Sequence, residues 1–250
     1  MTPAMAILSR TIEAALRMPR SVFLAFAVLV PTGIYALIAM RLTVERALEE
    51  LVIATIVLTA LFLPAVAIFI SASVLGDERR DGTLSFLVLR PLSRFSVAAT
   101  KIGAGVLAAG AINALGALAL TATYGLISGS WSLVLPLTVS AVAVTAGYVA
   151  IFVPLGYFTD RAVIIGFVFV LIFENGIAGA VPGLSGLSLW RIGYTALAGL
   201  AGLDASDEIV GAALSGLTPG VGGAVLRVGV LLLIAIVFQG WVLRTRDITT

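Results

Sequence analysis

Long apolar stretches without a charged side chain constrain this chain more than any other feature. The longest runs from Ile102 to Thr159, 58 residues without Asp, Glu, Lys or Arg, and Ser21–Met40 adds 20 more. Because an α-helix rises about 1.5 Å per residue, about 20 apolar residues cross the roughly 30 Å hydrocarbon core of a bilayer. Within one segment only a helix satisfies all of its own backbone hydrogen bonds there. We therefore expect an all-α, polytopic membrane protein.

Six predicted spans account for the apolar sequence, within a single domain of residues 1–250. The chain is 60% hydrophobic and 11% charged, whereas a soluble domain is about 25% charged. The 58-residue run holds two spans with a turn at Ser128-Gly129-Ser130-Trp131. The predicted spans are residues 21–40, 51–75, 102–127, 133–157, 162–181 and 224–243.

The distribution of Lys and Arg among the connections predicts the orientation, because cytoplasmic loops carry the excess of these residues. With both termini in the cytoplasm, the outer side holds only Arg41, Arg46, Arg191 and Arg227 of the 15 basic residues. The other 11 lie on the inner side: Arg10, Arg17, Arg20, Arg79, Arg80, Arg90, Arg94, Lys101, Arg161, Arg244 and Arg246. We therefore expect both termini to be cytoplasmic.

Residues 1–20 are predicted to form an amphipathic interfacial helix. Their apolar side chains recur at spacings of three and four, and the arginines lie largely on other faces. The alternative is a disordered tail with a few arginines on the inner side. The predicted apolar face consists of Met5, Leu8, Ile12, Ala15 and Leu16.

The connection between the fifth and sixth spans, residues 182–220, is long for a loop and rich in Leu, Ala and Gly. Two short helical stretches are predicted in it, near residues 187–203 and 206–217. Segments this apolar but too short to span suit re-entrant or interfacial helices on the outer side.

The connection between the second and third spans, residues 76–101, carries five basic and three acidic residues in 26 positions. Gly82 permits a sharp turn, and Thr83 is placed to cap a short helix over residues 84–89. Pro91 ends that helix, because it lacks an N–H and restricts Arg90. The pattern predicts a short apolar-faced helix on which another protein docks. The alternative is a positively charged loop whose Leu and Phe side chains lie on lipid.

This connection resembles the type-2 ABC exporter permease family. The family pattern is an acidic residue, a basic residue, Gly-Thr-Leu, a Leu-rich turn, Pro-x-Ser-Arg and a Lys. It is matched by Asp77-Glu78-Arg79-Arg80-Asp81-Gly82-Thr83-Leu84, Leu87, Arg90-Pro91-Leu92-Ser93-Arg94 and Lys101. A second patch is also similar to the family, Phe173-Glu174-Asn175-Gly176 followed by Val181-Pro182-Gly183-Leu184.

The resemblance implies a permease subunit of an ATP-driven exporter in a prokaryotic cell membrane. Two permease copies, a homodimer or a heterodimer, would face each other above two cytoplasmic ABC ATPase subunits. Residues 1–20 would be the family's elbow helix. The short helix in residues 76–101 would be the coupling helix. The implied ATPase-coupling residues are Asp77, Glu78, Arg79, Gly82, Thr83, Leu84, Phe86, Leu87, Arg90, Pro91, Ser93, Arg94 and Lys101.

Cofactors are expected only on the partner. The sequence has no GxxxxGK[ST] motif, since its single lysine stands in Thr100-Lys101-Ile102, so it lacks the usual phosphate-binding loop. We expect this chain to bind no cofactor itself, with ATP and magnesium on the ATPase subunits. The absence of His and Cys removes the usual bases, thiolate nucleophiles and soft-metal ligands. We therefore predict no catalytic or metal site, and the net charge of +2 gives no indication of nucleic acid.

Glu174 is the only acidic residue well inside a predicted span. It lies 13 residues beyond Arg161, which is about 20 Å along a helix. A lipid-exposed charge at mid-bilayer costs about 2.5–3.5 kcal/mol, so Glu174 should face protein or a wet cavity. One interpretation is that Glu174 and Asn175 line the translocation path or the dimer seam. The alternative is a structural carboxylate that caps a broken helix near Asn175-Gly176.

Two other functions remain open at this point. An ion-coupled secondary transporter or channel would use Glu174, the only acidic residue well inside a span, and would leave the charged connection unexplained. An integral-membrane enzyme would lack His, Cys and a dense acidic cluster. An ATPase partner would distinguish the permease from both.

Overall fold

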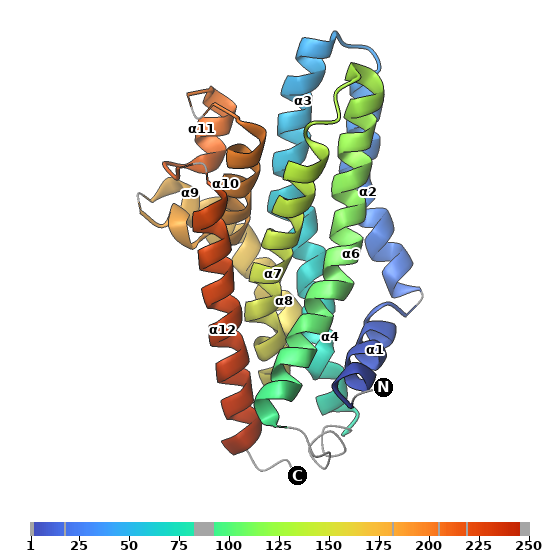
Figure 1. The fold of residues 1–250 in the computed structure, drawn as a ribbon, viewed down its shortest axis with the longest axis vertical. Coiled ribbons are helices and arrows are strands. Elements are labelled where there is room, and N and C mark those ends of the chain that lie inside the picture. Colours follow the sequence, from blue (N-terminus) through green and yellow to red (C-terminus); the bar gives the residue numbers. More distant parts are fainter. Residues whose placement is uncertain are drawn as a thin grey trace.

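The computed structural model describes residues 3–17, 19–82, 93–181, 183–204, 206–218 and 220–245. Throughout these residues the regular secondary structure is helical, and six helices are long and apolar enough to cross a membrane. The predicted all-α, six-span fold is therefore confirmed. The long helices run side by side along the long axis of the molecule (Figure 1). We call the end that holds α1 and the last turn of α12 the terminal end, and the opposite end the distal end.

The six long helices follow one another along the chain, with the longest connection between the fifth and the sixth. The first is α2 (Arg20–Ala39), and the second is one continuous rod from Val44 to Arg80. That rod comprises α3 (Val44–Val57), the π-helical segment η1 (Leu58–Phe62) and α4 (Leu63–Arg80). The next two are α6 (Arg94–Ser128) and α7 (Val134–Phe158). The fifth joins α8 (Ala162–Val168), the π-helical segment η2 (Phe169–Ile177) and α9 (Ala178–Ala180), and the sixth is α12 (Val221–Thr245).

Two helices extend well beyond the apolar stretches that predicted them. The second begins at Val44 rather than residue 51 and continues to Arg80, and α6 begins at Arg94 rather than residue 102. The predicted connection 76–101 is thereby reduced to residues 81–93. The reason is physical: hydropathy marks the part of a helix inside the hydrocarbon, whereas backbone hydrogen bonding continues until a residue breaks it. The predicted short helix at residues 84–89 lies outside the described residues.

The N-terminal helix α1 (Pro3–Ala15) packs along the terminal part of α6 and touches α4. Its buried side chains are Ile7, Thr11 and Ala15, at a spacing of four. Of the predicted apolar face only Ala15 is buried, and Met5 is exposed. The apolar periodicity thus located the helix but not the stripe that meets protein, because lipid and protein both accept apolar side chains.

Glycines let α7 approach α4 closely and α6 approach α2 closely. A Cβ placed on Gly156 of α7 would lie 2.5 Å from the carbonyl oxygen of Ala72 in α4, which is a backbone contact. In the same way a Cβ on Gly116 of α6 would lie 2.5 Å from a methyl group of Val28 in α2. Such close packing is the main attraction between helices in lipid, where apolar burial alone favours neither protein nor lipid contact.

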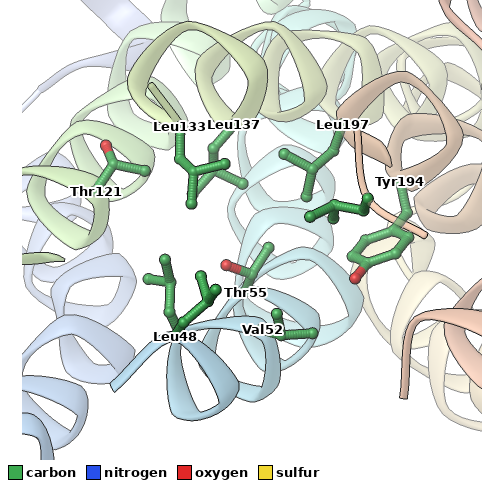
Figure 2. A pocket seen from close by; sticks show the side chains of 10 residues that line it. Leu48, Val52, Thr55, Thr121, Leu133, Leu137, Tyr194 and Leu197 are labelled. Carbon is green, nitrogen blue, oxygen red and sulfur yellow. The ribbon is translucent and has the colours of Figure 1, made fainter. Parts of the chain in front are cut away.

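The chain between the fifth and sixth spanning helices packs beside the distal half of the bundle (Figure 1). It contains η3 (Ser185–Leu187), α10 (Leu189–Ala201) and α11 (Glu208–Leu214). Helices α10 and α11 lie within the two stretches predicted as helical, and η3 begins two residues before the first of them. Helix α10 packs against α7 and α12 and is buried over most of its length. A small apolar cavity of about 20 Å³ lies between α3, the start of α7 and α10, with the Tyr194 ring on one side (Figure 2).

Candidate functional site

A group of charged side chains gathers at the terminal end, around the last turn of α4. This helix ends in a turn at Gly82, whose φ of 66° is the left-handed conformation that glycine accepts most easily. The sharp turn predicted for Gly82 is therefore present. We call the surrounding ion-paired residues the terminal cluster, and its members are Arg20, Asp77, Glu78, Arg79, Arg80, Lys101 and Asp160.

Lys101 forms the buried half of the terminal cluster. Its side chain is 2% exposed, it is ion-paired with Glu78, and its Nζ donates a hydrogen bond to Thr11 Oγ1 at 2.7 Å. The three partners lie on α6, α4 and α1 respectively. Thr11 was not predicted as a site residue. The sequence signal for it is its position one helical turn from the apolar residues Ile7 and Ala15, which places its hydroxyl on the same face. One ammonium group thus ties the N-terminal helix to two spanning helices.

The more exposed half of the terminal cluster links α4 to two other elements. Asp77 is paired with Arg80, and its Oδ2 lies 3.9 Å from Arg20 Nη1 at the start of α2. Asp160, in the connection between α7 and α8, is paired with Arg79 and lies 3.7 Å from Arg80. Exposed pairs like these are each worth about 0–1 kcal/mol. These pairs mark the places where the elements meet, and they contribute little to the free energy of unfolding.

Ser93 caps α6, since its Oγ accepts a hydrogen bond from the backbone N–H of Ser96 at 3.1 Å. Arg94 is the first residue of the same helix. The charged ends of the connection therefore belong to helices α4 and α6. The remaining predicted coupling residues, Thr83, Leu84, Phe86, Leu87, Arg90 and Pro91, lie outside the described residues.

At the other end of the bundle, Glu174 is fully buried and faces protein. Its carboxylate accepts hydrogen bonds from Ser188 Oγ at 2.6 Å and from the backbone N–H of Leu189 at 3.0 Å. Ser188 and Leu189 are the N-cap and first residue of α10. Glu174 therefore caps the N-terminus of α10, where unpaired N–H groups and the helix dipole favour a negative charge. The predicted helix break at Asn175-Gly176 is absent, because η2 runs through both residues to Ile177.

Arg191 completes this distal cluster, which we define as Glu174, Ser188 and Arg191. Its Nη1 donates to the backbone carbonyl of Glu174 at 2.8 Å, and its guanidinium carbon lies 4.3 Å from the centre of the Trp190 ring. Burial lowers the pKa of Arg191 from its ordinary value, and the Glu174 carboxylate opposes that shift. Neither Ser188 nor Arg191 was predicted as a site residue. The sequence signal for Arg191 is its position as a charged residue within an otherwise apolar stretch.

Asn175 repairs a backbone defect. Its Nδ2 donates to the carbonyl of Val170 at 2.9 Å in its own helix and to the carbonyl of Ala60 at 3.2 Å in η1. Pro64, four residues beyond Ala60, has no N–H to offer that carbonyl. In a bilayer an unpaired carbonyl costs several kcal/mol, so a side-chain amide from a neighbouring helix is a strong substitute. The bond joins the two π-helical segments of the bundle.

Within the described residues no group of three or more acidic side chains is placed to hold a metal ion. The polar groups of both clusters are engaged in ion pairs, helix caps and bonds between helices. Their arrangement fits the positioning of helices against one another.

Comparison with known families gives a match over most of the spanning helices. Residues 15–181 match the family described as ABC-2 family transporter protein, which is 167 of the 250 residues. The matched region contains the terminal cluster, Glu174 and Asn175, and ends before α10. A search of curated proteins finds no match. With six apolar helices of spanning length and a family match over two thirds of its sequence, this chain belongs to the ABC-2 transporter family and is a multi-pass membrane permease subunit of an ABC transporter.

Proposed function

We propose that this permease subunit forms, as a dimer, the translocation path of an ATP-driven exporter. Two separate cytoplasmic ABC ATPase subunits would supply the driving motion. The observation that carries the proposal is the terminal cluster, which joins α4 to α1, α2, α6 and the α7–α8 connection. It lies at the two ends of residues 81–93, the segment whose sequence resembles the family's coupling element.

In this proposal, closure of the ATPase subunits on ATP displaces the segment between α4 and α6. Because that segment begins and ends in long continuous helices, its displacement moves α4 and α6 as rods. Lys101 would carry the motion to α1, and Asp77 and Asp160 would carry it to α2 and α8. Alternating access would follow from the relative movement of these helices in the two copies.

The proposed setting is a prokaryotic cell membrane with both termini in the cytoplasm. The excess of Lys and Arg on that side supports the orientation. ATP and magnesium would bind only to the ATPase subunits, because this sequence has no phosphate-binding loop. A homodimer is the simplest assembly, with a second, different permease chain as the alternative.

For Glu174 and Asn175 we propose a position beside the path between the two copies. They would act through the elements that they hold, α10 and the paired π-helical segments. Ion coupling through Glu174 is the weaker alternative. Its carboxylate is fully buried and bound by two donors, whereas an ion-coupling group must exchange its ligand with water on each side.

The experiment that tests this function is affinity purification of the tagged chain in mild detergent from its native host, with mass spectrometry and an ATPase assay. We expect an ATPase subunit in equimolar amount. Arg90→Glu should abolish its co-purification or uncouple hydrolysis from transport, because charge reversal opposes the docking contacts. Arg41→Glu, the same charge change at an exposed position of the distal end, is the matched control and should change neither.

A clean purification without any ATPase, from cells shown to express one, would overturn the proposal. So would an Arg90→Glu complex that transports and hydrolyses ATP as the unmodified complex does. In either case the ion-coupled alternative would become the leading interpretation, and Glu174 the residue to test.

A further inference from the structure

A pocket of about 200 Å³ opens at the terminal end between α2, α4 and the α7–α8 connection. A single buried water needs only about 10–15 Å³ on this measure, so the pocket accommodates a group much larger than water. Its polar wall includes Arg20, Asp77, Arg80 and Asp160, and its apolar wall includes Phe69 and Val163.

The charges around the pocket favour an anion. The pocket lining holds Arg20 and Arg80 together with Asp77 and Asp160. Arg79, paired with Asp160 from outside the lining, makes three guanidinium groups to two carboxylates. One positive charge is therefore in excess within this set. The side chains of Arg20 and Arg80 are 33% and 48% exposed, so both keep donor groups within reach of a ligand.

The pocket also lies at the depth of a lipid headgroup. Arg20 is the first residue of the spanning helix α2, and Arg80 is the last residue of α4. About one helical turn further into the span, Phe23 and Ile164 are 67% and 64% exposed on the helices that flank the opening. These apolar surfaces offer acyl chains a place directly beneath the polar wall.

We propose that this pocket binds the headgroup of an anionic phospholipid from the leaflet at the terminal end. Arg20 and Arg80 would contact the phosphodiester group. The acyl chains would lie along Phe69, Val163 and the exposed faces of α2 and α8. Basic pockets between spanning helices on the cytoplasmic side are known to suit anionic headgroups. The inference concerns lipid binding by the permease chain and stands or falls apart from the proposed transport function.

A headgroup in this position would touch the elements that the terminal cluster joins. It would neutralise the excess positive charge and connect α2 to α4 through the phosphate. The lipid would therefore act as an additional member of the cluster, and its headgroup charge would affect how firmly α2 and α8 are held to α4.

The test uses the purified full chain in mild detergent and native mass spectrometry. Phosphatidylglycerol and phosphatidylcholine with identical acyl chains are the probes, and inorganic phosphate is the competitor. We expect one tightly held phosphatidylglycerol and no comparable phosphatidylcholine adduct. Arg20→Gln and Arg80→Gln should each weaken phosphatidylglycerol binding about fivefold, which corresponds to about 1 kcal/mol for each basic residue near an anionic lipid.

Arg10→Gln is the matched control, since Arg10 is an exposed arginine of α1 outside the pocket, and it should leave binding unchanged. Arg20→Lys keeps the charge and should bind nearly as well as the unmodified chain. Should Arg20→Gln not fold, the half-exposed Arg80 still provides the test. Equal retention of both lipids, or full binding by Arg80→Gln, would overturn the inference. Displacement of the lipid by inorganic phosphate would show that the ligand is a free anion rather than a lipid.

Discussion

At the scale of single residues, Glu174 shows how one carboxylate positions a whole element. It is fully buried, and its two oxygens accept the hydroxyl of Ser188 and the first N–H of α10. The backbone of the same residue receives the guanidinium of Arg191. These hydrogen bonds hold the start of α10 to the fifth spanning helix and satisfy donor groups at the N-terminus of α10.

This geometry separates two substitutions of Glu174. In Glu174→Gln the amide oxygen still accepts from Leu189 and the amide nitrogen donates to Ser188, so we expect a loss of about 1 kcal/mol or less. Glu174→Ala leaves the donors of α10 unpaired and a void, and should cost about 3 kcal/mol. Thermal unfolding in detergent measures both. We further expect Glu174→Gln to reduce transport while assembly with the ATPase persists.

Two outcomes distinguish a role of Glu174 beside the translocation path from a purely structural role in capping α10. Normal transport by a well-expressed Glu174→Gln complex would contradict a role beside the path. A Gln variant as unstable as the Ala variant would show that the negative charge itself is needed for the fold.

The site residues differ in how far the sequence predicts them. Glu174 was identifiable because an isolated carboxylate inside an apolar span is costly, which forces it to face a partner. Its partners Ser188 and Leu189 were not identifiable from the sequence. They lie 14 and 15 residues further along the chain, beyond a turn, and helical periodicity does not predict the path of a turn. Lys101 came from family resemblance, and its hydroxyl partner Thr11 lies 90 residues away. Spacing arguments reach about one helical turn, and these contacts lie far beyond it.

At the scale of elements, the two π-helical segments depend on each other. The α-helical donor to the carbonyl of Ala60 in η1 is missing because the residue four positions on is Pro64, and Asn175 of η2 donates to that carbonyl at 3.2 Å. π-Helical turns are rare and are concentrated at functional positions. This pair joins the second and fifth spanning helices, with Ala60 buried and Asn175 exposed on the flank of the bundle.

A double-mutant cycle tests that dependence. Asn175→Leu should cost about 0.6–1.7 kcal/mol, between the average and the largest value measured for hydrogen bonds between membrane helices. In a Pro64→Ala background the new N–H of residue 64 can pair with Ala60, so the same Asn175 change should cost much less. Unfolding in detergent of the four proteins gives the coupling energy. Additive effects would contradict the compensation.

Close packing of α4 on α7 supplies a second prediction at this scale. In Gly156→Ala the new methyl group would stand 2.5 Å from the Ala72 carbonyl, so the two helices must separate at a cost of about 1–3 kcal/mol. Gly103→Ala is the matched control in α6, where a Cβ meets nothing within 4 Å. It should be neutral or stabilising, by up to about 1 kcal/mol of helix propensity. Equal thermal midpoints for the two variants would contradict the contact.

Element boundaries show which part of the fold hydropathy determines. The turn at Ser128-Gly129 was predicted and is present, because Gly129 adopts the left-handed conformation that ends α6, with a φ of 75°. The second and third rods begin seven and eight residues before the predicted spans, at Val44 where the span begins at 51 and at Arg94 where the span begins at 102. Charged residues end a hydrophobic segment without ending a helix.

At the scale of the whole molecule, the terminal cluster is where most of the helices meet. Lys101 and Glu78 form its buried pair, so removing one partner leaves the other uncompensated. We expect Lys101→Met to destabilise the protein by about 3 kcal/mol, and Lys101→Met with Glu78→Met to recover most of that loss. Thermal unfolding of the single and double variants is the measurement. A double variant no more stable than Lys101→Met would show that the pair contributes by more than mutual neutralisation.

The placement of charge has an electrical consequence. Between the clusters at its two ends, the bundle is built from stretches without Asp, Glu, Lys or Arg, among them residues 102–159 and 228–243. Moving one elementary charge through a potential of 100 mV is worth about 2.3 kcal/mol. If every charged side chain stays at its own end of the bundle, helix movement carries almost no charge across the membrane potential. We therefore expect ATP hydrolysis by the complex in sealed vesicles to be independent of an imposed membrane voltage, leaving the nucleotide as the source of work.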